Sequence, residues 1–305
     1  VASCETKRAK TTKMAQRYHG RSISLPSRSH PSTIKIEQEL NKLKIWEASS
    51  TSTSAGSICS GLSGLVELYI CIDELLNLAS VQQVLSQNQP QKYVDDFLDG
   101  SLKLLDICGI TRDIMLQIKE NVQALQSALR RRKGDVSIER SMTSYTCFRK
   151  KMKKDVKKLI TGLNHMDTKL MAPQLLDLDG HISAVIHVLR EVNATSISIF
   201  QSLLLFLLAP VAKPKQSRWS LVSTLMHKGA IACKEQHDSQ NDLDNVDFAL
   251  RKYVISEGSD AVKTQDARKR LEALEISIEG LESSLECLFR RLIKTRTSFL
   301  NIISQ

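Results

Sequence analysis

The residue types that carry most enzyme chemistry occur in this chain, but they do not fall into catalytic or metal-binding patterns. Seven histidines and seven cysteines are spread over 305 residues, without an HExxH motif, a CxxC pair or a Cys–His pair at zinc-ligand spacing. No GxSxG nucleophile motif and no glycine-rich phosphate loop is present either. The sequence therefore predicts no catalytic residue, no cofactor, no metal site, no small-molecule substrate and no enzymatic activity.

A serine motif near the N-terminus is the first candidate site for another kind of chemistry. Arg21 lies three residues before Ser24, as basophilic kinases require, and Pro26 lets the chain leave a phosphoserine-binding groove. The segment Arg21-Ser22-Ile23-Ser24-Leu25-Pro26 matches phosphopeptides of the 14-3-3 type, in which an arginine cluster holds the phosphate. Arg21, Ser22, Ser24 and Pro26 thus predict a phosphoserine-binding adaptor as a partner. A linker that nothing recognises is the alternative, since short motifs arise by chance in serine-rich tails.

The second candidate is the basic segment 130–158, which holds twelve Lys/Arg residues and three acidic residues. Its first cluster is Arg130, Arg131, Arg132 and Lys133, and its second is Arg149, Lys150, Lys151, Lys153, Lys154, Lys157 and Lys158. Such local charge suits an anionic lipid surface, or a bipartite nuclear import signal, or a solvated helix face that balances acidic neighbours. Nucleic acid is disfavoured, because only Tyr145 and Phe148 lie nearby as stacking residues.

The cysteine pattern and the N-terminus indicate the compartment. The cysteines are scattered, and no apolar segment of a secretory signal follows the basic N-terminal residues. We therefore predict an intracellular protein, with the cytoplasm as the first choice. A nuclear, membrane-peripheral or plastid location stays open, because a transit peptide is also basic and poor in acids.

Long helices must position these candidate sites, and the clearest of them lies at the C-terminal end. Apolar residues recur at alternating steps of three and four, at Leu271, Leu274, Ile278, Leu281, Leu285, Leu288 and Leu292, with Thr295 interrupting the seam before Phe299. The pattern continues to Ile302, so it predicts a helical rod of about 48 Å over 271–302 that needs partner helices to cover its apolar stripe. Additional apolar residues at Phe289 and Ile293 widen the stripe, which favours packing in the chain's own bundle over a two-stranded coiled coil.

The remaining apolar periodicity predicts an all-α, elongated multi-helix bundle over residues 34–305, preceded by a disordered, basic, serine-rich tail over 1–33. Further helices are expected over 34–48, 62–85, 93–108, 110–132, 145–171, 178–208, 219–233 and 247–256. Flexible linkers are expected near 49–60, 134–143, 209–217 and 234–245. The very apolar run Leu203–Leu208 is too short to span a bilayer and is predicted to lie in the centre of the bundle.

Several segments in one order along the chain resemble a known family. They are Arg21-Ser22-Ile23-Ser24-Leu25-Pro26-Ser27-Arg28-Ser29-His30-Pro31, Leu98-Asp99-Gly100-Ser101-Leu102-Lys103-Leu104-Leu105-Asp106-Ile107-Cys108-Gly109, Leu125-Gln126-Ser127-Ala128-Leu129-Arg130-Arg131-Arg132, Arg149-Lys150-Lys151-Met152-Lys153-Lys154 and the stretch from Leu281 to Arg296. Together they resemble the plant-specific BYPASS-related family, whose biochemical function is unknown. The resemblance implies a plant protein, a largely helical fold and links to root and shoot development.

Two functions from different classes follow from these observations. The first is a non-enzymatic interaction or scaffold protein in plant development, regulated in part through its N-terminal serines. The second is a peripheral membrane protein that binds anionic lipid through the basic helix 149–158, assisted by the apolar run Leu203–Leu208. Lipid binding that is sensitive to salt would separate the two.

Overall fold

The computed structural model describes residues 31–49, 54–87, 91–131, 136–170, 180–208, 241–255 and 261–304. Its helices are α1 (Pro31–Ser49), α2 (Ala55–Leu76), α3 (Ala79–Gln87), α4 (Gln91–Arg130), α5 (Val136–Leu170), α6 (Gly180–Leu208), α8 (Asp242–Ile255) and α9 (Ala261–Ile303). The described residues contain no strand, so the prediction of an all-α bundle is confirmed. The tail predicted over 1–33 lies outside the described residues as far as residue 30, but residues 31–33 are helical, because α1 begins at Pro31, and proline suits the first turn of a helix. The linker 209–217 and the helix 219–233 also lie outside the described residues.

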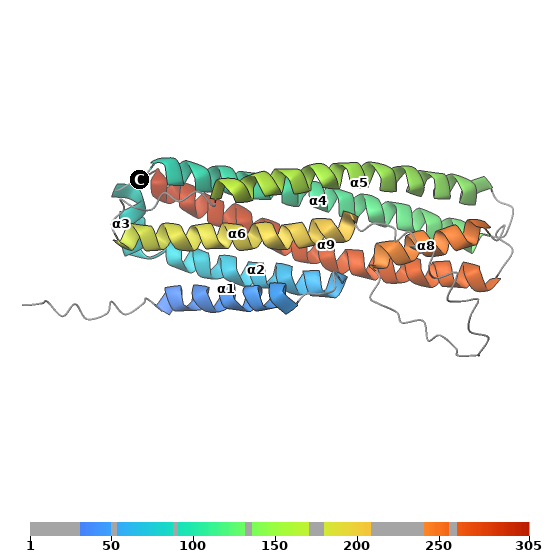
Figure 1. Ribbon diagram of the computed structural model, residues 1–305, viewed down its shortest axis with the longest axis horizontal. Coiled ribbons are helices and arrows are strands. Elements are labelled where there is room, and N and C mark those ends of the chain that lie inside the picture. The colour runs from blue at the N-terminus through green and yellow to red at the C-terminus, as the bar shows by residue number, and fades with distance from the viewer. Residues whose placement is uncertain are drawn as a thin grey trace, which may run out of the picture.

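The helices form an elongated bundle along α9, which runs its whole length and spans about 64 Å (Figure 1). α2, α4 and α8 pack along α9, while α5 and α6 lie against each other and α1 covers α2. Every residue of the predicted seam, from Leu271 to Leu292, is at most 2% exposed. The seam is therefore covered by several helices of the same chain, as the sequence predicted. Of the two residues expected to widen the stripe, Phe289 is half-buried, but Ile293 is 44% exposed and does not take part in the packing.

Thr295, which interrupts the apolar seam in the sequence, does not interrupt the packing. It is 2% exposed, and its hydroxyl donates a hydrogen bond of 2.5 Å to Oδ1 of Asp73 on α2. Lys294 lies 3.3 Å from the other oxygen of that carboxylate. Thr295 and Asp73 thus form a buried polar contact between α9 and α2. An aliphatic residue at position 295 could not donate this hydrogen bond to the Asp73 carboxylate.

Several helix ends differ from the sequence predictions. Helix α2 begins at Ala55, because the Ser54 hydroxyl caps it by accepting the Ser57 N–H at 3.2 Å, so the linker expected over 49–60 is shorter. Helix α5 begins at Val136, inside the linker expected over 134–143. Helix α8 begins at Asp242 instead of 247, since the Asn241 side chain accepts the Leu243 N–H at 2.9 Å.

Two predicted helix connections are also different in the structure. The helix expected over 62–85 is two helices, because α2 ends at Leu76 and α3 turns across the end of the bundle (Figure 1). Conversely, the break expected at Gly109 does not occur, and α4 continues through it for 40 residues. A single glycine costs a helix only about 1 kcal/mol, which the packing of buried Cys108 and Thr111 on either side offsets.

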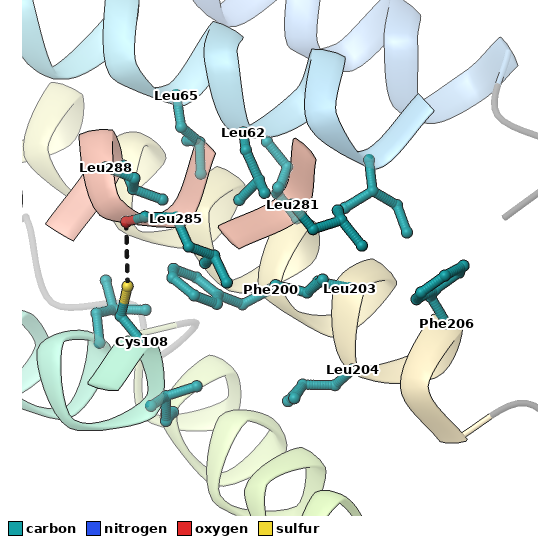
Figure 2. Packing of buried hydrophobic residues seen from close by; sticks show 14 of the residues in the cluster. Leu62, Leu65, Cys108, Phe200, Leu203, Leu204, Phe206, Leu281, Leu285 and Leu288 are labelled. Carbon is teal, nitrogen blue, oxygen red and sulfur yellow. Dashed lines mark hydrogen bonds between the residues drawn. The ribbon is translucent and has the colours of Figure 1, made fainter. Parts of the chain in front are cut away.

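The apolar run of α6 lies in the core, as Figure 2 shows. Phe200 and Leu203 of α6 lie on the side of Leu281 and Leu285 of α9, with Leu62 and Leu65 of α2 beyond them, whereas Leu204 points to the opposite side of α6. The Cys108 thiol of α4 donates to the Leu285 carbonyl at 3.8 Å. Of the run Leu203–Leu208, only Leu205 is largely exposed, at 53%. The buried side chains of this run therefore pack in the core of the bundle, while Leu205 faces outward.

Two helices are long and apolar enough to cross a membrane by length and composition alone. They are Ala55–Leu76, which is α2, and Ser183–Leu208 in α6. About half of each segment is buried inside the bundle, 44% and 56% respectively. The central helices of a helical bundle have apolar faces of this kind, so the composition of these two helices does not by itself indicate a membrane-spanning segment.

Candidate functional site

The basic face predicted on the helix after residue 145 is present on α5. Tyr145, Met152, Val156 and Leu163 point into the bundle at steps of seven, four and seven residues. The opposite side carries five exposed lysines, which we call the α5 lysine face: Lys150, Lys151, Lys154, Lys157 and Lys158. They occupy about 12 Å of helix. Lys158 lies 3.6 Å from Asp155 in the same helix, and among the described residues the other four form no ion pair.

Lys153 stands at the edge of this face and differs from the five. Its side chain is half-buried, and burial together with the neighbouring Arg149 lowers its pKa. The acids Asp247 and Asp244 of α8 act in the opposite direction. Lys153 therefore belongs to the contact between α5 and α8 as much as to the solvent-facing surface.

Arg149, predicted as part of the surface patch, is instead buried, with 4% exposure. Its guanidinium donates to both oxygens of Asp247 on α8, with Nη2 2.9 Å from Oδ2 and Nε 3.3 Å from Oδ1 and Oδ2. Nη1 donates to the Leu207 carbonyl of α6 at 3.3 Å, and the Tyr145 hydroxyl donates to Asp247 at 2.7 Å. Burial and the Asp247 carboxylate raise the pKa of Tyr145, so the phenol stays protonated and able to donate.

The Arg149 prediction was wrong because the residue lies on the inward stripe of α5. It follows Tyr145 by four residues and precedes Met152 by three, which is the spacing of one helix face. Sequence reasoning grouped it with the adjacent lysines by charge. Its position between Tyr145 and Met152 on the inward stripe indicates a buried arginine, which requires an acidic partner. The sequence does not show that this partner is Asp247.

The other basic cluster is separate from the α5 lysine face. Arg130 and Arg131 are exposed at the C-terminal end of α4, and Arg132 and Lys133 lie outside the described residues. Lys151 borders a shallow hollow with Asp113 and Gln117 of α4. Seventeen residues of α4 separate Asp113 from Arg130, or about 25 Å. The structure thus places the two clusters at different positions along the α4–α5 pair instead of in one patch.

A family model described as Protein BPS1 matches residues 61–302, which is most of the chain and runs from within α2 almost to the end of α9. The chain belongs to the BPS1 family. The match confirms the resemblance to the BYPASS-related family. No curated protein and no solved structure gave a significant match.

The part of the chain that matches the BPS1 family contains the α5 lysine face and the Arg149–Asp247 pair, whereas α1 lies before it. The candidate phosphoserine motif, Arg21, Ser22, Ser24 and Pro26, also lies before it and outside the described residues. The docking motif and the basic face are thus features of different parts of the chain.

Other buried polar groups of this BPS1-family chain connect helices. Tyr69 of α2 and Ser196 of α6 share a hydrogen bond of 3.1 Å, and burial raises the pKa of Tyr69 to about 12. Arg296 of α9 donates to the Leu98 carbonyl and to the Ser101 hydroxyl of α4. Among the described residues, no group of three or more His, Cys, Asp or Glu side chains could hold a metal ion. Sequence reasoning missed these pairs, because the partners are far apart along the chain.

Proposed function

We propose that this BPS1-family chain is a non-enzymatic interaction protein of plant root and shoot development that binds acidic partner proteins through the α5 lysine face. The observation that carries the proposal is the set of five exposed lysines on three turns of one helix, of which only Lys158 is paired within the part of the chain that the structure describes. Such a surface is costly to leave without counter-charges, since like charges repel along a helix. A partner with several carboxylates would relieve that repulsion.

The helix that presents these lysines is held firmly in the bundle. Arg149 and Tyr145 attach α5 to α8 through Asp247, and Met152 and Val156 are buried between the lysines. A charged surface on a fixed helix loses little conformational freedom when a partner binds, which favours a specific complex. The buried charges Arg149 and Asp247 bond to each other across two helices and therefore stabilise the bundle. This structural role supports an interaction protein over an enzyme.

Anionic lipid is the second candidate partner, favoured by the same face. Each lysine close to an anionic membrane contributes about 1 kcal/mol, so five lysines could hold the protein at a surface at moderate salt. Leu203, Leu204, Phe206 and Leu207 are buried, however, and cannot supply the apolar insertion expected from the sequence. Lipid binding would therefore be electrostatic alone and would weaken steeply with salt.

The test uses a charge-reversed variant of the full chain, Lys150→Glu/Lys154→Glu/Lys157→Glu. Lys153 is left unchanged, because it borders the Arg149–Asp247 pair. The matched control is Lys42→Glu/Arg251→Glu/Lys269→Glu, which changes net charge equally at exposed positions outside both basic clusters. Tagged proteins are captured from plant cells and their partners compared. Loss of partners in the first variant alone supports the proposal, and identical partner sets for natural chain and variant contradict it.

Co-sedimentation with vesicles of phosphatidylcholine and phosphatidylserine separates the two candidate partners. Binding to these vesicles at physiological salt that the α5 variant loses and the control keeps would favour the membrane function. If no vesicle binding occurs while protein partners depend on the lysines, the scaffold function stands. The intracellular location is part of the same proposal, and a fluorescent fusion of the full-length protein would test it.

A further inference from the structure

A cavity is lined mainly by residues of α4, α6 and α9, with Leu85 of α3 and Met166 of α5 at its edge. It lies at the end of the bundle that α3 crosses, and Figure 1 shows this crossing. Its volume is about 60 Å³, and it opens to the surface. Phe97 of α4 and Phe299 of α9 form part of its wall, with ring centroids 4.4 Å apart. Val94, Ile186 and Leu189 add further apolar surface. Nothing in the proposed binding of acidic partners uses this cavity.

One buried polar side chain, Asn193 of α6, lines the cavity without a hydrogen-bond partner among the described residues. It is 3% exposed. Its amide atoms are not among the fully buried polar atoms that lack a partner, so the amide is open to whatever enters the cavity, which is solvent or a ligand. An amide both donates and accepts, and it suits a ligand that does the same.

Space in front of Asn193 is kept open by a glycine. Gly100 of α4 lies opposite, and a Cβ there would stand 3.3 Å from Nδ2 of Asn193. That distance is tight, so any side chain at position 100 would press on the amide and reduce the cavity. A glycine inside a 40-residue helix lowers helix stability by about 1 kcal/mol relative to alanine. At position 100 it also keeps the space in front of Asn193 open.

The charge and size of the cavity restrict the ligand. Asp96, Asp99, Lys103 and Arg190 line it, and their formal charges cancel, which favours an uncharged ligand. A cavity of about 60 Å³ is smaller than the engineered cavity of about 150 Å³ that encloses benzene. The enclosed part therefore fits a slender alkyl chain better than a ring, with the remainder of the molecule in the opening.

We propose that this cavity binds a small uncharged amphiphile, whose alkyl chain lies against Phe97, Leu189 and Phe299 and whose carboxamide, carbonyl or hydroxyl group bonds to Asn193. No covalent step is involved. The site is independent of the α5 lysine face, and occupancy would fix α4, α6 and α9 relative to one another at this end of the bundle.

The test is a saturation-transfer NMR titration of the full chain with hexanamide, compared with hexanoate and hexylammonium. Hexanamide is expected to bind more tightly than either charged analogue. Gly100→Leu fills the cavity and is expected to weaken binding at least tenfold. Gly109→Leu is the matched control on the same helix, because no atom lies within 4 Å of a Cβ at that position, and it is expected to bind normally.

A second variant tests the role of the amide without filling the cavity. Asn193→Leu has similar size and removes a buried polar group, so it is expected to fold and to bind hexanamide about five- to tenfold more weakly. The proposal is overturned if the natural chain does not bind hexanamide, or if a charged analogue binds more tightly. Equal binding by Gly100→Leu and Gly109→Leu, or by Asn193→Leu and the natural chain, would also overturn it.

Discussion

Two contacts between neighbouring helices of this bundle use opposite physical means. Helix α1 packs on α2 through shape: a Cβ at Gly61 would lie 2.7 Å from the Trp46 ring, and one at Gly64 would lie 2.6 Å from Leu43. Helix α8 packs on α9 through apolar side chains, but its contact with α5 depends on charge, in the buried Arg149–Asp247 pair. The contact between α1 and α2 should be disrupted by a larger side chain at Gly61 or Gly64, and the contact between α5 and α8 by removal of one of its two charges.

The largest effect is expected from breaking the charged contact. Arg149→Ala leaves the Asp247 carboxylate buried without its cation, and removal of one partner of a buried ion pair costs about 3–5 kcal/mol. The free energy of unfolding from urea denaturation measures this loss. Lys150→Ala, one residue further along the same helix but exposed, is the control and should change stability by less than about 0.5 kcal/mol.

Replacing both charges sharpens the same comparison. Arg149→Met with Asp247→Leu removes the pair together and should recover most of the stability, because a buried pair is worth little against an apolar pair of similar volume. If the double variant is as unstable as Arg149→Ala, the loss comes from the hydrogen bonds to Tyr145 and Leu207 and not from an uncompensated buried charge.

An intermediate effect is expected from breaking the contact based on shape. Gly61→Ala places a Cβ against the Trp46 ring, and overpacking of this kind costs about 1–3 kcal/mol. Hydrogen exchange of the α1 amides should accelerate more than exchange in α9, since α1 contacts the bundle mainly through α2 and α6. Gly56→Ala is the matched control: no atom lies within 4 Å of its Cβ, so it should slow exchange or leave it unchanged. Equal exchange in the two variants would contradict the close approach of α1 and α2.

A smaller effect concerns the pH dependence of the charged contact between α5 and α8. Burial and the nearby Asp247 raise the pKa of Asp244 in α8 above its usual value. The folded state then binds a proton more readily than the unfolded chain, so this residue lowers stability as pH rises through the interval above the unfolded pKa of 3.8. The stability of Asp244→Asn relative to the natural chain should therefore increase from pH 4 to pH 7, by less than about 1 kcal/mol because the group is partly solvated. A difference that is constant over this range, in denaturation curves at several pH values, would show that Asp244 is not perturbed.

The same contrast explains what the sequence could predict. Periodic apolar positions such as Leu271 to Leu292 determine a buried face locally, so the rod and the all-α bundle were predictable. Buried polar contacts such as Thr295–Asp73 and Arg149–Asp247 join residues that are distant in the chain, and no local pattern specifies the partner. The break after Leu76 and the continuity through Gly109 likewise depend on neighbouring helices more than on local propensity. For the candidate site, the lysines of α5 were predictable from their spacing, but the burial of Arg149 and the cavity beside Asn193 required the packed structure.

The smallest effect is expected on the α5 lysine face itself. Lys158→Ala removes the pair with Asp155, an exposed contact between neighbours on one helix that is worth at most about 0.5 kcal/mol. Lys154→Ala and Lys157→Ala remove charges that have no ion-pair partner among the described residues, and reduced repulsion between neighbouring lysines should offset the lost packing of their alkyl stems. Thermal unfolding of the three variants should therefore be close to that of the natural chain, while binding of acidic partners decreases. A clear loss of stability would mean that these lysines support the bundle, and the α5 face would then resemble the Arg149 contact instead of a binding surface.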